Sequence, residues 1–212
     1  MNSDTIERLK QRLKGNLPGL KAQVEMAPHL QDTDLIKYFE KKNLTESRPS
    51  GVLILIYPHK NELYIPLMLR PQYGGTHGGQ VSFPGGKMEN IDGNLTETAL
   101  REAEEELGIP SSKVKILGTI SELFISASNF NVLPVVGYLD HRPDFRIDKR
   151  EVVQVIETPI SVLADSGIIK EKPIRVSTGH LLQAPYYDVN NHTVWGATAM
   201  MLSEFLTIYK DL

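Results

Sequence analysis

The 212-residue sequence contains no cysteine and no long apolar run. Without cysteine the chain has no thiol nucleophile, no cysteine-ligated zinc and no disulfide, although this alone does not fix its compartment. No stretch approaches the roughly 18 apolar residues of a membrane-spanning helix, so we expect no membrane partner. Segment 1–13 carries charges throughout and lacks the apolar core of a signal peptide, which predicts a cytoplasmic protein.

Neither sign of charge dominates the chain. It has 23 Lys and Arg against 26 Asp and Glu, a formal net charge of -3. Because this balance comes without a local basic patch, nothing attracts a polyanion and we expect no nucleic-acid partner. The hydrophobic fraction of 41% and charged fraction of 23% are typical of a globular protein. The oligomeric state stays open, with a homodimer as one alternative.

The length suits one domain with a terminal extension. We expect residues 1–50 to form a helical segment packed on a domain of residues 51–212. The first helix is indicated by apolar residues at i, i+3 and i+7, which are Ile6, Leu9 and Leu13. A second helix is expected near residues 35–42.

Hydrophobic patterns predict several strands, the first two joined as a hairpin through the turn-like segment 59–61. The predicted strands cover residues 51–57, 63–70, 114–120, 132–139 and 152–156. The predicted helices cover residues 94–107 and 196–209, with a helical turn at 161–164. Strand, helix, strand units do not repeat as they would in a doubly wound sheet. The predicted fold class is therefore α+β, an α-β-α sandwich with a mixed β-sheet flanked by helices.

The helix predicted at 94–107 carries the densest charge in the chain. Glu102, Glu105 and Glu106 stand at i, i+3 and i+4, so their carboxylates share one face. Three like charges there repel each other, and a cation that prefers oxygen ligands, Mg²⁺ or Mn²⁺, relieves the repulsion. A Glu-rich helix is more often a plain solvated face, but here Arg101 can bridge to Glu105 and orient a ligand.

Segment 85–109, GGKMENIDGNLTETALREAEEELGI, resembles the Nudix box. Its leading glycines, Gly85 and Gly86, let bare backbone approach an ion or a phosphate. The residues that match the second half of the box in full are Arg101, Glu102, Ala103, Glu105, Glu106, Gly108 and Ile109. In the first half the acidic residue is Asp92, and eight residues rather than seven separate it from Arg101.

This resemblance implies the Nudix fold and an enzyme, a Nudix diphosphatase that hydrolyses a nucleoside diphosphate linked to another group. It implies Mg²⁺ or Mn²⁺ as the cofactor. The metal ligands that it implies are Glu102, Glu105, Glu106 and the Gly86 carbonyl. Arg101 is expected among the catalytic residues because it orients a metal ligand. Either Glu105 or Glu151 is expected to be the general base.

Segment 76–87, THGGQVSFPGGK, resembles the signature of the coenzyme A diphosphatase branch of Nudix hydrolases. It implies that the small-molecule substrate is coenzyme A or a related nucleotide, cut to 4′-phosphopantetheine and adenosine 3′,5′-bisphosphate. The substrate-binding residues expected from it are Arg70, His77, Gln80, Gly85 and Lys87. Gly75 stands where the branch has a second Arg, so Arg70 or Lys87 would have to contact the 3′-phosphate.

Two rival interpretations remain from the sequence. A Nudix enzyme that acts on ADP-ribose, NADH or a nucleoside triphosphate would share the box but not the block at 76–87. A non-catalytic Nudix-fold binding module typically lacks a box Glu, whereas all three persist here. A magnesium-dependent phosphate-release assay separates an enzyme from such a module.

Overall fold

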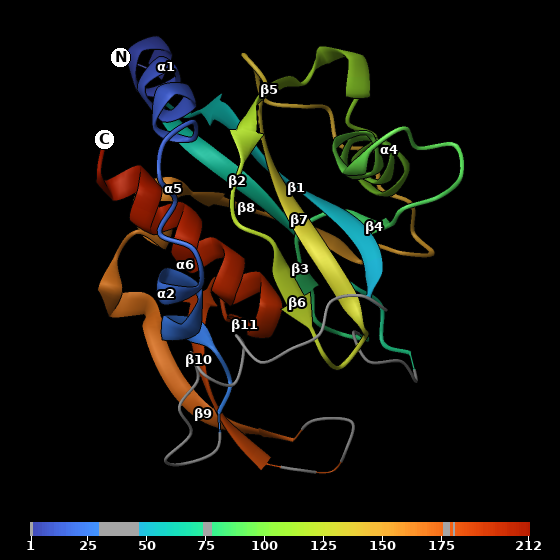
Figure 1. The fold of residues 1–212 in the computed structure, drawn as a ribbon, viewed down its shortest axis with the longest axis vertical. Helices are drawn as coiled ribbons and strands as arrows, with labels where there is room; N and C mark the ends of the chain where they lie inside the picture. The colour runs from blue at the N-terminus through green and yellow to red at the C-terminus, as the bar shows by residue number, and fades with distance from the viewer. Residues whose placement is uncertain (1, 30–46, 74–77, 176–178, 180) are drawn as a thin grey trace.

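The computed structural model describes residues 2–29, 47–73, 78–175, 179 and 181–212. The helix expected near 35–42, together with Gly75 and His77, lies outside these residues. The described chain forms an eight-stranded mixed sheet with helices on both faces and a three-stranded sheet beside it (Figure 1).

The elements follow the chain in this order. The strands of the larger sheet are β1 (Arg48–His59), β2 (Glu62–Leu69), β3 (Val81–Ser82), β4 (Gly85–Lys87), β5 (Lys115–Thr119), β6 (Leu123–Ile125), β7 (Phe130–Tyr138) and β8 (Gln154–Pro159). The strands of the smaller sheet are β9 (Ile169–Arg175), β10 (Leu181–Val189) and β11 (His192–Trp195). The helices are α1 (Asn2–Arg12), α2 (Leu20–Gln23), α4 (Leu95–Leu107), α5 (Ile160–Leu163) and α6 (Gly196–Lys210), and the 3-10 turns are η1 (Val24–Met26), η2 (Ser111–Lys113) and η3 (Ser166–Ile168).

Strand β1 lies at the centre of the larger sheet. It runs parallel to β7 and antiparallel to β2 and β4, so the sheet is mixed as the sequence predicted. The turn between β1 and β2 places Lys60 and Asn61 at φ 47° and 64°. A two-residue turn with both φ angles positive matches the twist of a hairpin, and the predicted hairpin is confirmed.

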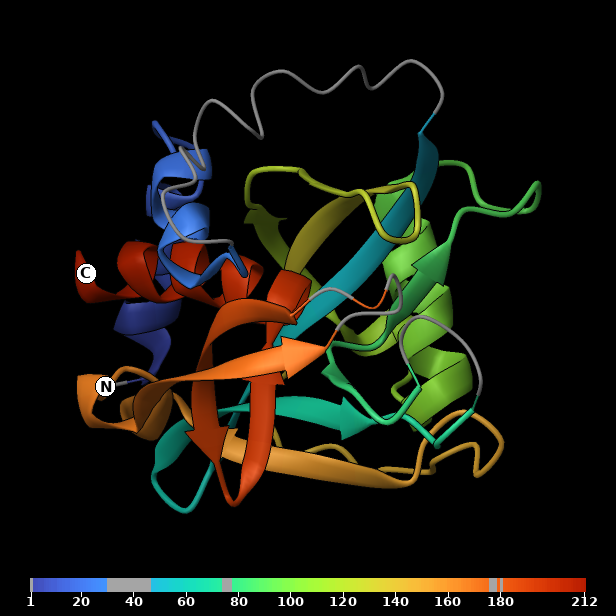
Figure 2. The same cartoon turned by 90° about the horizontal axis from the view of Figure 1, so that it is seen from below.

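The two faces of the sheet carry separate apolar clusters. Leu53 and Leu55 of β1 pack with Ala103 of α4, whereas Ile54 and Ile56 belong to the cluster that includes α6. Neighbouring residues of a strand point to opposite faces, so β1 contributes to both clusters. In Figure 2, β1 crosses the molecule between α6 and α4. The predicted α-β-α arrangement is confirmed.

The N-terminal helices contact α6 through a buried carboxylate. Glu204 of α6 has no exposed surface and accepts hydrogen bonds from the Gly19 N–H (3.0 Å), the Gln23 side chain (2.7 Å) and the Ser121 N–H (3.3 Å). Farther along the segment, the backbone of His29 exchanges two hydrogen bonds with Gln183 of β10. These contacts fasten residues 2–29 to both α6 and the smaller sheet.

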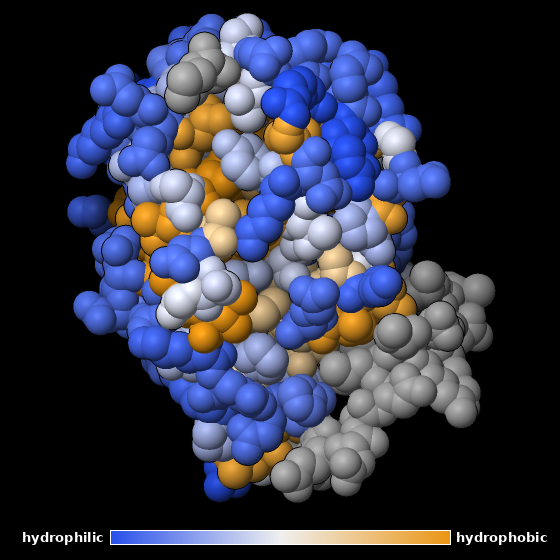
Figure 3. Space-filling model, turned by 90° about the vertical axis from the view of Figure 1, so that its left-hand side faces the viewer, coloured by the Kyte–Doolittle hydropathy of each residue, from blue (hydrophilic) through white to orange (hydrophobic). Residues whose placement is uncertain are grey.

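The surface mixes polar and apolar side chains. On the face that Figure 3 turns to the viewer, apolar side chains gather in patches across the middle, with polar side chains around them. Large apolar residues of the described chain that remain exposed include Val162 (41%) and Ile169 (43%). Within the described ranges, no helix has the length and apolar character that a bilayer crossing would require.

Candidate active site

Helix α4 is delimited by local hydrogen bonds at both ends. At its start, the Asn94 side chain accepts from the Glu97 N–H (3.0 Å), and the Glu97 carboxylate accepts from the Gly93 N–H (2.9 Å). At its end, Gly108 adopts φ 69° and donates to the Glu104 carbonyl (2.9 Å). Asn94 is thus the N-cap and Gly108 the C-cap of the helix predicted at 94–107, and together they fix which residues form its last two turns.

Glu106 is the most buried carboxylate of the box. Its side chain is 2% exposed, accepts from the Gly85 N–H (2.8 Å) and pairs with the Arg70 guanidinium (3.1 Å). Burial raises the pKa of Glu106 to about 8, although Arg70 and the Gly85 N–H act in the opposite direction. Repulsion from Glu102 and Glu151 raises the pKa further. The site therefore favours a neutral Glu106 unless positive charge is added.

Glu102 lies one turn earlier, against the glycines of β4. Burial raises the pKa of Glu102, and Arg101 offsets part of this rise. A Cβ atom added to Gly86 would come within 2.4 Å of a Glu102 carboxylate oxygen, so no larger residue fits there unless that carboxylate moves. The Gly86 carbonyl itself accepts a hydrogen bond from the Ser50 hydroxyl (2.6 Å). Ser50 was not anticipated from the sequence.

Arg101 connects three carboxylates. Its guanidinium lies 2.8 Å from Asp92, 3.0 Å from Glu102 and 3.0 Å from Glu105, so the predicted Arg101–Glu105 bridge is confirmed. It also donates to the Lys87 carbonyl (3.2 Å) and so reaches β4. The Glu105 side chain is 60% exposed, unlike those of Glu102 (14%) and Glu106 (2%).

Asp92 holds Arg101 from the loop before α4. Its carboxylate also accepts from the Thr98 hydroxyl (3.0 Å) and the Glu89 N–H (2.9 Å), and only 3% of its side chain is exposed. The hydrogen bond from Arg101 is the main cause that holds the pKa of Asp92 well below its usual range. The acidic residue of the shifted first half of the box is thus an anchor for Arg101.

The Asp92→Asn variant should lose about 2–4 kcal/mol of unfolding free energy at pH 7, because Arg101 would keep a buried position without its charge partner. Because the pKa of Asp92 is lowered in the folded chain, its carboxylate stabilises the fold at pH values above its ordinary pKa of 3.8. This stabilisation is lost as the pH falls toward the pKa of Asp92 in the folded chain. Urea unfolding at pH 7, 5, 4 and 3 should therefore show the difference from the wild type narrowing below about pH 4. A difference that stays constant to pH 3 would contradict the anchoring role of the Asp92 charge.

Glu151 belongs to a loop that is bound to the end of α4. The Arg146 N–H donates to the Leu107 carbonyl (2.8 Å) and the Asp148 N–H to the Glu106 carbonyl (3.0 Å), which satisfies carbonyls that the helix end leaves open. The Glu151 N–H then donates to the Asp148 carbonyl (3.0 Å). Glu151 is exposed, yet its charge raises the pKa of both Glu102 and Glu106. The loop thus brings the Glu151 charge within electrostatic range of both carboxylates.

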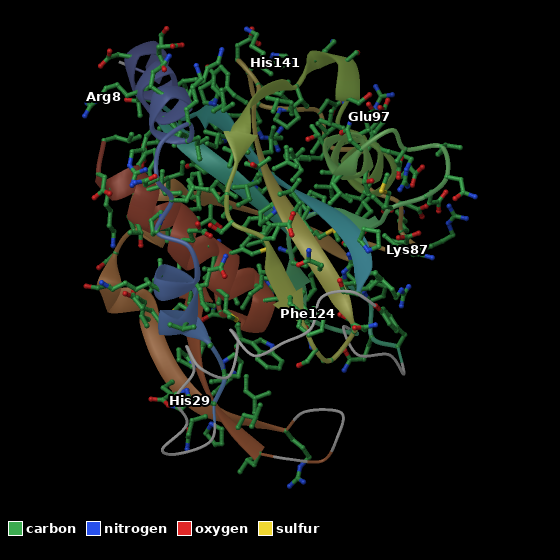
Figure 4. All side chains as sticks on the ribbon, in the orientation of Figure 1. Arg8, His29, Lys87, Glu97, Phe124 and His141 are labelled. Carbon is green, nitrogen blue, oxygen red and sulfur yellow. The ribbon has the colours of Figure 1, made fainter. Side chains whose placement is uncertain are left out.

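The predicted substrate-binding residues have different surroundings. Arg70 is directed at Glu106 and Gly85, while the Gln80 carbonyl accepts from the Arg70 N–H (3.0 Å). Lys87 is exposed at the end of β4, on the side of the molecule that carries α4 (Figure 4). His77 lies outside the described residues.

A hollow of about 250 Å³ lies beside the C-terminal end of α4, where Gly108 and Arg146 belong to its lining. None of the residues that line it is a predicted site residue. His141, which belongs to its lining, lies well away from Lys87 in Figure 4. This hollow is separate from the cluster of box carboxylates.

The donors around Glu102 and Glu106 suit Mg²⁺ or Mn²⁺, because they are all oxygens and two of them are carboxylates with raised pKa. The close approach of Gly86 to Glu102 adds a backbone carbonyl nearby. In the described part of the chain, no three His, Asp or Glu side chains are grouped so that they could hold a metal ion as they stand. Glu105, which pairs with Arg101, would have to turn to join the other two.

Comparisons with known proteins identify the family of this chain. A family model for the NUDIX domain matches residues 47–163, more than half of the chain. A Yersinia enterocolitica protein described as the uncharacterized Nudix hydrolase NudL is 35% identical over 155 residues, which cover 68% of this chain and 78% of the relative. A Salmonella paratyphi B protein with the same description is 34% identical over 151 residues, 66% of this chain and 77% of the relative.

Among solved structures, the MutT/nudix family protein from Enterococcus faecalis has a TM-score of 0.49 and 12% identity, and covers 86% of this chain and 70% of its own. The C. elegans Ap4A hydrolase binary complex has a TM-score of 0.47 and 15% identity, and covers 54% of this chain and 81% of its own. Neither likeness says anything about the substrate of this chain.

The site places an acidic helix face against the glycines of β4, an arrangement with the oxygen donors of a divalent-metal hydrolase. The family match and the relatives narrow this class. The chain belongs to the Nudix family and is a Nudix hydrolase. Members of this family generally use divalent metals such as Mg²⁺ or Mn²⁺ and act on small nucleotide-derived molecules.

Proposed function

We propose that this Nudix hydrolase uses Mg²⁺ or Mn²⁺ to cleave the diphosphate of coenzyme A or its derivatives. The products are 4′-phosphopantetheine and adenosine 3′,5′-bisphosphate. The observation that carries the proposal is the block at 76–87, whose described part, 78–87, includes the Gly85 N–H that binds Glu106 and the Gly86 backbone that lies close to Glu102. The segment that resembles the coenzyme A branch is therefore also a wall of the site.

The metal ligands in this proposal are Glu102 and Glu106, with Glu105 and the Gly86 carbonyl as further oxygen donors. When bound, Mg²⁺ or Mn²⁺ supplies positive charge that neutralises the diphosphate and acidifies the attacking water. Arg101 orients Glu102 and Glu105, because Asp92 holds its guanidinium in place. Added positive charge also favours the ionised forms of Glu102 and Glu106, whose pKa values burial has raised.

Glu151 is the general base of the proposed reaction. It accepts a proton from the attacking water, and the water oxygen forms a bond to one phosphorus of the diphosphate. The bond from that phosphorus to the bridging oxygen breaks, and its electron pair leaves with the other phosphate. The overall reaction consumes one water and releases two phosphate monoesters. The exposed position of Glu151 leaves room for that water.

Lys87 is the proposed contact for the 3′-phosphate of coenzyme A. It is exposed next to the two glycines of β4, whereas the guanidinium of Arg70 already binds protein groups. Gln80 and Gly85 belong to the same segment, and His77 remains a predicted contact. The segment would thus determine specificity while the carboxylates of α4 perform the chemistry common to the family.

A substrate panel should rank coenzyme A first and 3′-dephospho-coenzyme A about tenfold lower in kcat/KM, because a charge-assisted phosphate contact is lost. The panel should include ADP-ribose, NADH and a nucleoside triphosphate, each with Mg²⁺ or Mn²⁺ at matched pH, and products should be identified by mass spectrometry. Lys87→Met should reduce the preference for the 3′-phosphate. Hydrolysis of ADP-ribose much faster than coenzyme A would overturn the substrate and leave only the family chemistry.

A further inference from the structure

Arg70 links four elements through one side chain. It follows β2 directly, and its Nε donates to the Ser82 hydroxyl of β3 (3.1 Å). One terminal nitrogen donates both to the Gly85 carbonyl of β4 (3.2 Å) and to the Glu106 carboxylate of α4 (3.1 Å). The side chain is 19% exposed. Most of the guanidinium is thus enclosed by the groups that it binds.

The Glu106 carboxylate is held from two sides. One oxygen receives Arg70 and the other receives the Gly85 N–H (2.8 Å). Since Arg70 also binds the Gly85 carbonyl, the peptide groups on both sides of Gly85 in β4 are held, one as a donor and one as an acceptor. A planar guanidinium fork can hold such a set of acceptors at once, which a single ammonium cannot do with the same geometry.

We propose that Arg70 is a positioning residue that holds the Glu106 carboxylate and the Gly85–Gly86 start of β4 in the arrangement a divalent cation requires. It acts through Glu106 and not through a phosphate of the substrate. The inference rests on the proposed function only in treating Glu106 as a metal ligand. It replaces the expectation from the sequence that Arg70 binds substrate.

The two roles for Arg70 predict changes in different measured constants. A residue that supports a metal ligand affects metal affinity and kcat. Substituting a residue that hydrogen-bonds to a metal ligand typically lowers metal affinity or activity by about 10- to 100-fold. A residue that binds a substrate phosphate affects KM and leaves metal binding by the substrate-free protein unchanged. Measuring Mn²⁺ affinity without substrate therefore separates the two roles.

The experiment compares the wild type with Arg70→Gln and Arg70→Lys, and uses Arg8→Gln as the matched control. Arg8 lies on α1, across the molecule from Lys87 (Figure 4). Mn²⁺ affinity is measured by calorimetric titration of the substrate-free full chain. The kinetic constants kcat and KM are measured with the best substrate of the panel, and thermal unfolding checks that each variant folds. Arg70→Gln should weaken Mn²⁺ binding and lower kcat by about 10- to 100-fold while KM changes less than about threefold.

Arg70→Lys should fall between the wild type and Arg70→Gln, since it keeps the charge and loses the fork. If Arg70→Gln does not fold, the lysine variant carries the test alone. Arg8→Gln should match the wild type. A tenfold rise in KM with unchanged Mn²⁺ binding in the Arg70 variants would overturn the inference. Absence of Mn²⁺ binding by the wild type would overturn the metal site itself, and a different best substrate would leave the inference standing.

Discussion

Glu106→Gln should lower kcat on the order of 10³-fold without loss of the fold. The amide keeps an acceptor for the Gly85 N–H but removes the negative charge that a divalent cation needs. Glu102→Gln should have an effect of similar size. Glu105→Gln should cost about tenfold, because that side chain is 60% exposed and is bound by Arg101. Steady-state kinetics over a range of Mg²⁺ concentrations would measure all three.

Glu104→Gln is the matched control on the same helix. Glu104 is exposed and accepts from the Ser111 N–H (3.1 Å), away from the box carboxylates. Its substitution should leave kcat unchanged within about twofold. Near-normal activity in both Glu102→Gln and Glu106→Gln would reject the metal site.

Stability without metal gives a second measurement on Glu106→Gln. The pKa of Glu106 is raised to about 8 in the folded chain, so between the ordinary value of 4.5 and 8 only the unfolded chain ionises this group. Below pH 4.5 the Glu106 carboxyl is neutral in both the folded and the unfolded chain. As the pH rises above 4.5, its ionisation in the unfolded chain increasingly favours unfolding. In EDTA, the wild type should therefore lose unfolding free energy relative to Glu106→Gln from about pH 4.5 to 8. Adding Mn²⁺ should stabilise the wild type and have little effect on the variant.

The central part of the fold and the acidic helix were predictable because their signals are local. Asn94, Glu97 and Gly108 fix the ends of α4 through neighbours within a few residues in the chain. The apolar run of β1 reads as a strand buried on both faces, and the structure places α4 and α6 on those faces. The i, i+3, i+4 spacing put the three box carboxylates on one helix before any tertiary contact was known.

The smaller sheet was missed because its first strand lacks an apolar pattern. Strand β9 reads IKEKPIR, is largely exposed, and owes its regular structure to pairing with β10. Predicted strand 152–156 also shifted: Val152 is buried in the loop, and β8 runs over Gln154–Pro159. The pairing of strands that are distant in the sequence cannot be predicted from patterns of neighbouring residues.

The same limit applies to the residues that support the site. Arg70 lies 36 positions from Glu106, and Ser50 lies 36 positions from Gly86, so no sequence spacing reveals their contacts. The sequence shows Asp92 as a departure from the box. Its ion pair with Arg101 depends on how the loop before α4 folds back onto the helix, which the spacing does not specify. The separation of Glu105 from the buried pair likewise follows from burial, which helical spacing does not specify.

The loop that carries Glu151 makes this residue the strongest candidate for the base. The backbone of this loop is bound to the carbonyls of Leu107 and Glu106, so the loop and α4 are held together. The side chain is exposed, and its charge acts on both Glu102 and Glu106. Glu105, the alternative base, is paired with Arg101, which occupies one of its carboxylate oxygens.

Glu151→Gln should therefore lower kcat by about 10²-fold or more while Mn²⁺ affinity changes less than about threefold, because an amide cannot accept the proton. The rise of kcat with pH that reports ionisation of the base should disappear. Lys149→Gln, a nearby exposed substitution, is the control for changes in the loop itself. If Glu151→Gln retains the wild-type pH profile, the base is Glu105, and Glu105→Gln should then flatten that profile. A parallel loss of Mn²⁺ affinity in Glu151→Gln would instead make Glu151 a metal ligand, since a base outside the coordination shell has no reason to weaken metal binding.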